Sequence, residues 1–210
     1  VDGSVSDPDG TATESIAITA VYSTHGTWQY RLGSGSWTTL TGTVTSARLL
    51  RSSDAIRFIP AANYTGSASF TFRAWDETSG SAGDLADTST NGGTTAFSTA
   101  SDSATISVNP VNDAPVLTPG NPTLPTITEE KTTGSSIAVS DLVGNSIADV
   151  DASALEGIAV FSASDTHGTW QYSTNGGTTW SAIAPVAPHN ALLLSLTSTN
   201  RIRFVPDTQN

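Results

Sequence analysis

Carboxylate side chains recur with one spacing at two places in the chain, and oxygen clusters of this kind bind calcium. In each place an Asp-x-Asp pair is followed five residues later by a glutamate. The two clusters are Asp7-Pro8-Asp9 with Glu14, and Asp149-Val150-Asp151 with Glu156. Residues i and i+2 of an extended segment project to the same side, and Ca²⁺ takes six to eight oxygen ligands. The spacing favours a calcium site at each place, and an Asx turn at each pair is the alternative.

The two clusters belong to a tandem repeat. The string HGTWQY occurs at residues 25–30 and again at residues 167–172, and this offset of 142 residues also separates Asp7 from Asp149. A later match aligns Arg57 with Arg203. Repeats this long are complete domains rather than solenoid units, so each copy should have its own core.

A proline-containing segment, residues 108–117, separates the copies. Proline fixes φ and keeps the preceding residue extended, which predicts a short, stiff linker. We therefore expect one domain over residues 1–113 and a second over residues 114–210. The chain has no methionine, and its second copy ends before the segment that matches residues 67–108. We expect a fragment of a longer protein that lacks the start of the first domain and the last strands of the second.

Composition narrows the classes of partner. The 210 residues carry 19 acidic and 8 basic side chains, a formal net charge of −11, and no cysteine. An acidic surface repels phosphate and attracts divalent cations, which argues against a nucleic-acid partner. No stretch has the length of a membrane span, so we expect no membrane insertion. Without cysteine, disulfides and thiol catalysis are both excluded.

The secondary-structure signal is that of β-strands. Apolar residues alternate at period two over residues 15–22, 55–59, 69–75 and 103–108, and no segment has a convincing helical period. Several short strands in each copy predict an all-β protein of tandem β-sandwiches. The irregular residues 79–96 are expected to form an inserted loop or hairpin excursion.

The tryptophans allow two interpretations. Trp28 and Tyr30 share one strand face, as do Trp170 and Tyr172, and glycine-rich turns predict that each strand forms a hairpin with the segment that follows it. The structural interpretation makes these aromatic rings core residues or cross-strand pairs. The functional alternative is a sugar-binding platform of exposed rings formed by Trp37, Trp75 or Trp180.

The sequence gives no catalytic site, and we expect no enzyme. His25 and His167 occupy equivalent positions before a glycine, which is typical of a turn, and His189 stands apart. An Asp pair that recurs in each copy suits a structural junction better than glycoside hydrolysis. No phosphate-binding glycine loop opens a helix.

Three segments carry a family resemblance: Val-Asn-Asp-Ala-Pro at residues 111–115, Arg-Phe-x-Pro-x-x-Asn-Tyr-x-Gly at residues 57–66, and Phe-Arg-Ala-Trp-Asp at residues 72–76. They resemble the tandem cadherin-like, immunoglobulin-like repeats of giant bacterial surface proteins, including RTX-type adhesins. The resemblance implies Greek-key β-sandwiches strung end to end, an extracellular location on a bacterial cell, and calcium at the domain junctions.

The resemblance also implies sets of calcium ligands. At the central junction these are Asn112, Asp113, Asp149 and Asp151. In the first copy Asp76 would join Asp7 and Asp9. Glu14, Glu156 and Glu130 would be additional ligands. The linker has one oxygen-bearing side chain fewer than the animal cadherin linker, which implies fewer ions or ligands completed by water.

The expected function is that of a non-catalytic extender in adhesion, made rigid by calcium, whose partners are the neighbouring repeats of its own chain. Two alternatives remain open. One is carbohydrate binding to surface glycans, and the other is a filament or matrix subunit in which copies of the chain exchange strands at exposed sheet edges.

Overall fold

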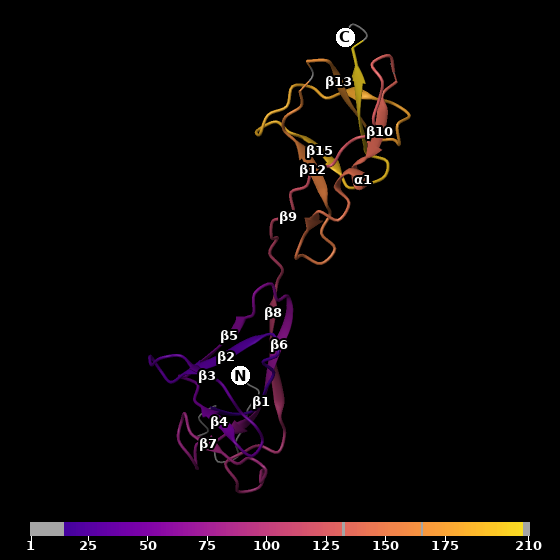
Figure 1. Ribbon diagram of the computed structural model, residues 1–210. Helices are drawn as coiled ribbons and strands as arrows, with labels where there is room; N and C mark the ends of the chain where they lie inside the picture. The colour runs from indigo at the N-terminus through magenta and orange to yellow at the C-terminus, as the bar shows by residue number, and fades with distance from the viewer. Residues whose placement is uncertain (1–14, 132, 165, 208–210) are drawn as a thin grey trace. The chain divides into compact units, whose positions relative to one another are not determined.

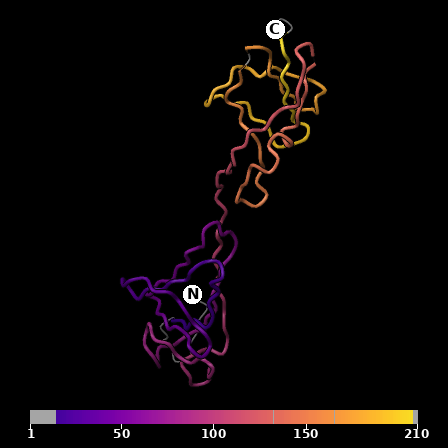
Figure 2. Tube along the Cα trace, viewed as in Figure 1, coloured from indigo at the N-terminus to yellow at the C-terminus, as the bar shows by residue number. Residues whose placement is uncertain are grey.

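The computed structural model describes residues 15–131, 133–164 and 166–207. The chain divides into two compact units between Val111 and Asn112. Nearly all regular structure is antiparallel β-sheet, with one five-residue helix in the described residues (Figure 1). Figure 2 follows the same chain path as a tube. The predicted all-β fold class is confirmed.

Unit 1 is a sandwich of two antiparallel sheets, with strand orders β7-β4-β1-β6-β8 and β3-β2-β5. The strands are β1 (Ser15–Val21), β2 (Gly26–Arg31), β3 (Thr38–Thr39), β4 (Ala47–Leu50), β5 (Ala55–Pro60), β6 (Gly66–Trp75), β7 (Leu85–Ala86) and β8 (Asp102–Val108). The four segments whose alternation predicted strands are β1, β5, β6 and β8. The predicted hairpin after the first HGTWQY string is the pair β2–β3.

The two sheets of unit 1 meet in an aromatic core. The larger sheet contributes Ile18, Phe70 and Phe72, and the smaller sheet contributes Trp28 and Tyr30, all buried. Each large apolar side chain buried in this way stabilises the fold by about 1.5–3 kcal/mol. The structural interpretation of the first copy's aromatic residues is therefore confirmed.

A second buried cluster lies on the other face of the larger sheet. Ala17 and Leu49 are each 0% exposed there, because Trp75, at the end of β6, and Phe97 pack over them. Phe97 follows directly after the irregular excursion predicted over residues 79–96, within which Thr88 is fully buried and Ala96 is 8% exposed. The excursion is thus a packed layer that covers the sheet.

Unit 2 contains shorter sheets, with strand orders β10-β16-β13-β14, β12-β15 and β9-β11. Its elements are β9 (Val116–Leu117), β10 (Ser135–Ala138), α1 (Val139–Val143), β11 (Ile147–Ala148), β12 (Gly157–Val160), β13 (Gly168–Ser173), β14 (Ser181–Ala182), β15 (Leu192–Ser195) and β16 (Arg201–Pro206). The second predicted hairpin is the pair β13–β14.

The repeat is visible in how the strands pair. β13 pairs with β14 and β16 as β2 pairs with β3 and β5, and β12 pairs with β15 as β1 pairs with β4. In the described residues of unit 2 no strand corresponds to β6 or β8. The equivalent strands therefore have different neighbours, since β1 has a strand on each side and β12 has one.

The helix α1 corrects the expectation of no helix. It is one five-residue turn with Asp141 in its first turn and Gly144 at its C-cap, and its Val139 is fully buried. So short a helix contains no full apolar period, which is why the sequence pattern did not indicate it. Within the described residues, no helix is long and apolar enough to cross a bilayer.

Candidate functional site

The structure brings the linker against the Asp-x-Asp loop of unit 2. The backbone N–H of Asp113 donates to Oδ2 of Asp151 at 2.8 Å, and the N–H of Asp151 donates to Oδ1 of Asp149 at 2.9 Å. The side-chain amide of Asn112 donates to the carbonyl oxygen of Asp113 at 2.7 Å. All four residues implied as ligands of the central junction thus lie in one hydrogen-bonded chain.

The small β9–β11 sheet explains this approach. Val116 pairs with Ala148 and Leu117 with Ile147, so the strand that leaves the linker runs antiparallel to the strand that enters the Asp-x-Asp loop. Asp113 and Asp149 lie just beyond the same end of this two-residue ladder. The pairing of β9 with β11 therefore brings the linker to the Asp-x-Asp loop.

The acidic residues of this site have no basic partner in the described part of the chain, where Arg51 and Glu77 of unit 1 form the one ion pair. Asp149 and Asp151 are half-buried, and Asp113 is exposed. Asp149 and Asp151 are two residues apart, and the backbone of Asp113 contacts the Asp151 carboxylate. Neighbouring negative charges repel one another, and a bound cation would relieve that repulsion.

The oxygen-bearing side chains of this site are of the type that calcium prefers, but they are too few to complete its coordination. Carboxylate and amide oxygens are the hard ligands that calcium prefers. Among the described residues, however, no group of three or more His, Cys, Asp or Glu side chains is close enough to hold a metal ion. The N–H of Asp151 also closes an Asx turn on Asp149, the alternative that the sequence allowed, and this turn uses one carboxylate oxygen. Backbone carbonyls and water would have to supply the remaining ligands.

Three of the other ligands implied by the resemblance are described by the structure: Asp76, Glu156 and Glu130. Oδ1 of Asp76 accepts from the N–H of Thr78 at 2.8 Å and from its hydroxyl at 2.7 Å. Asp7, Asp9 and Glu14, with which Asp76 was grouped, lie outside the described residues. In unit 2 the backbone carbonyl of Glu156 accepts from the N–H of Leu196, and Glu130 is an exposed turn residue.

One of the three tryptophans considered for sugar binding, Trp75, is buried. Trp75 is 1% exposed, and its indole N–H donates to the carbonyl of Ser79 at 2.8 Å, so its ring has no face available to a sugar. Trp37 and Trp180 are half-buried, and an arginine covers each ring.

A Gln-Arg-Trp stack recurs in both units. The guanidinium carbon of Arg57 lies 4.1 Å from the ring centroid of Trp37, and that of Arg203 lies 4.1 Å from the ring centroid of Trp180. Each arginine Nε also donates to a glutamine Oε1, in Gln29 at 2.9 Å and in Gln171 at 2.8 Å. The alignment of Arg57 with Arg203 in the two copies is the sequence feature that corresponds to this stack, but the alignment alone does not predict the stacking.

Changing Arg203 to lysine is expected to lower the free energy of unfolding of unit 2 by about 0.5–1 kcal/mol, because lysine cannot stack flat on an indole and hydrogen-bond a glutamine together. Thermal unfolding of a double-mutant cycle with Trp180→Leu measures the coupling between the two side chains. A coupling energy of zero would contradict a stabilising stack.

The histidines lie in turns, as predicted for the two in the repeated string. The His25 ring stacks on Tyr64 at a centroid distance of 4.7 Å with an interplanar angle of 5°, and the His25 carbonyl accepts from the N–H of Ala61 at 2.9 Å. The His167 carbonyl accepts equivalently from the N–H of Asp207 at 3.0 Å. These contacts give both turn residues a structural role.

No family model, no curated protein and no solved structure matches the chain.

Proposed function

We propose that the chain is a structural extender of a large extracellular bacterial surface protein, in which calcium at the linker makes the junction between tandem domains rigid. The observation that carries the proposal is the 2.8 Å hydrogen bond from the Asp113 N–H to Asp151, which joins the linker to the Asp-x-Asp loop. The motifs that resemble cadherin-like repeats support the same function.

The residues that would hold the ion are Asn112, Asp113, Asp149 and Asp151. A bound Ca²⁺ supplies six to eight ligand positions and two positive charges, which offset the negative charge of the three aspartates. Linker residues tied to the ion lose freedom of φ and ψ, so two domains that share the linker hold one orientation. A chain of such junctions becomes a rod that carries a distal binding domain away from the cell.

Calcium is expected to raise the unfolding temperature of the chain and to reduce the range of linker conformations. A ligand that binds the folded state at 100 times its Kd stabilises it by about 2.7 kcal/mol. Calorimetry and small-angle scattering in EGTA and in millimolar CaCl₂ measure the two effects. Identical melting curves and identical scattering profiles in both buffers would overturn the proposal.

The matched variants are Asp151→Asn and Asp141→Asn, which make the same change of charge. Asp151→Asn is expected to weaken calcium binding at least about tenfold in isothermal titration, since it removes a charged ligand. Asp141 is an exposed residue of α1, and its variant is expected to bind calcium like the unaltered chain. An equal loss of calcium affinity in both variants would show that calcium is attracted by the overall negative charge of the chain rather than bound at this site.

A further inference from the structure

One triplet of the sequence, Asn63-Tyr64-Thr65, has the spacing of an asparagine that accepts an N-linked sugar. The enzymes that attach such sugars require an asparagine, then any residue except proline, then a serine or threonine. Among the asparagines that are followed by two further residues, Asn63 alone meets this rule. Asn121 also has a threonine two positions later, but Pro122 stands between them.

The triplet lies in the turn that joins β5 to β6 in unit 1. Asn63 has a φ of 60°, in the left-handed region that asparagine adopts more readily than most residues. Asn63 and Thr65 are both exposed, and Tyr64 between them is half-buried. The turn therefore leaves accessible the two residues that such an enzyme requires.

Tyr64 attaches this turn to the rest of unit 1. Its ring stacks on His25 at a centroid distance of 4.7 Å, and its hydroxyl donates to the carbonyl oxygen of Ser67 at 2.7 Å. Its backbone N–H donates to the carbonyl oxygen of Ala61 at 3.2 Å. The middle residue, whose identity the enzyme does not read, is thus the one whose side chain packs against the domain.

The side-chain amide of Asn63 is not used by the fold. Within the part of the chain that the structure describes, neither this amide nor the Thr65 hydroxyl makes a hydrogen bond. The side-chain nitrogen of four other asparagines donates to a protein oxygen: Asn91, Asn112, Asn175 and Asn200. A bond formed at Nδ2 of Asn63 therefore breaks no contact of the folded domain.

We propose that Asn63 is an N-glycosylation site, at which a glycosyltransferase attaches a sugar from a sugar-diphosphate donor. Nδ2 of Asn63 attacks the anomeric carbon of the donor, and a C–N bond forms. The bond from that carbon to the phosphate oxygen breaks, the diphosphate leaves with the bonding electrons, and one amide proton passes to a base of the transferase. The inference rests on the extracellular location in the proposed function and does not depend on calcium.

The site lies at the end of unit 1 from which the linker leaves. Gly66, the first residue of β6, pairs with Val108, the last residue of β8, and residues 109–111 that follow are exposed. An attached sugar is bulky and hydrophilic. Because exposed connecting segments are preferred sites of proteolysis, a sugar on Asn63 shields the start of the linker.

Peptide mass spectrometry of the protein, isolated from the cells that make it, tests the proposal. The peptide that contains Asn63 is expected to carry the added mass of at least one sugar, and fragmentation is expected to place that mass on Asn63. Treatment with a protease before and after enzymatic removal of the sugar measures the shielding, and cleavage at the start of the linker is expected to be faster after removal.

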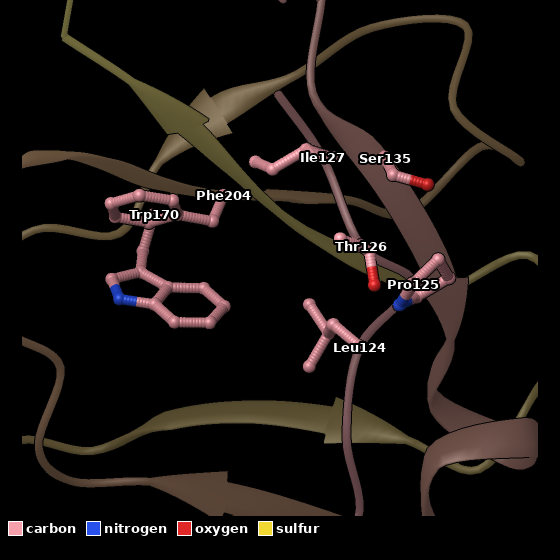
Figure 3. A pocket seen from close by; sticks show the side chains of 7 residues that line it. All are labelled: Leu124, Pro125, Thr126, Ile127, Ser135, Trp170 and Phe204. Carbon is pink, nitrogen blue, oxygen red and sulfur yellow. The ribbon is translucent and has the colours of Figure 1, made fainter. Parts of the chain in front are cut away.

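Asn121 is the internal control. It and Thr123 are exposed like their counterparts in the first triplet, but the proline between them prevents recognition. The segment that follows is part of unit 2, since Leu124 lines a hollow of about 240 Å³ together with Trp170 (Figure 3). The peptide that contains Asn121 is expected to be unmodified.

Three variants separate recognition from folding. Asn63→Gly keeps a residue suited to positive φ, so the domain is expected to fold while the added mass is lost completely. Thr65→Ala is expected to lose the sugar as well, whereas Thr65→Ser keeps the required hydroxyl and is expected to retain it.

An unmodified Asn63 in the native protein would overturn the proposal. A sugar that persists on this peptide in Asn63→Gly or in Thr65→Ala would overturn it too, because the modified atom would then be another one. Calcium titration of the unglycosylated chain measures the proposed junction separately, so either proposal can fail while the other stands.

Discussion

Replacing Trp28 with alanine is expected to lower the free energy of unfolding of unit 1 by about 3–5 kcal/mol. The side chain is 4% exposed and lies between Phe58 of the smaller sheet and Phe70 of the larger one. Its removal leaves a cavity at the point where the two sheets meet. Hydrogen exchange of the full chain, read from strands β1 and β6, measures the loss in unit 1 separately from unit 2.

Trp170→Ala is the matched control, because Trp170 occupies the same position in the second HGTWQY string. It is half-buried and packs on Phe204 alone of the rings described. The expected loss is about 1–2 kcal/mol, since fewer contacts are removed. Equal losses at the two positions would contradict the conclusion that Trp170 makes fewer packing contacts than Trp28.

Gly26→Ala is expected to destabilise unit 1 by about 1–3 kcal/mol, the usual cost of forcing extra atoms into a packed site. A Cβ at Gly26 would overlap the carbonyl oxygen of Ile59 and the ring of Phe58. In unit 2, a Cβ at Gly168 would overlap the Val205 carbonyl and the Phe204 ring in the same way. The glycine of the repeated string is thus required by the close approach of the strand paired with it, β5 in unit 1 and β16 in unit 2.

Gly120→Ala provides the comparison, because a Cβ at Gly120 meets no heavy atom within 4 Å. Its unfolding temperature in calorimetry is expected to equal that of the unaltered chain or to exceed it slightly, since alanine restricts the unfolded chain. Gly26→Ala with an unchanged unfolding temperature would show that β5 moves aside at no cost.

Period-two alternation was sufficient to place the long strands of unit 1. It also placed Phe70 and Phe72 on one face of β6 and Trp75 on the other. Alternation does not tell whether the second face is covered, because that depends on where the excursion packs. Trp75 therefore remained a candidate for sugar binding in the sequence, although Phe97 and the excursion bury it.

The candidate site was predictable in part. Spacing and resemblance pointed to Asp113, Asp149 and Asp151, and the structure brings these residues together through their backbone N–H groups. The sequence did not show that one of those bonds would be the Asx turn, because a turn and an ion use the same oxygens. It also did not reveal the Gln-Arg-Trp stacks, since stacking depends on which side chains neighbouring strands place side by side.

The unequal flanking of β1 and β12 has a consequence under tension. A strand with a ladder on both edges has about twice as many backbone hydrogen bonds to break as a strand with one ladder, and the ladders share the load. When the chain is pulled from its ends, the β12–β15 sheet should yield before the β4–β1–β6 sheet. Among the described residues, unit 2 is then expected to extend first while unit 1 stays folded.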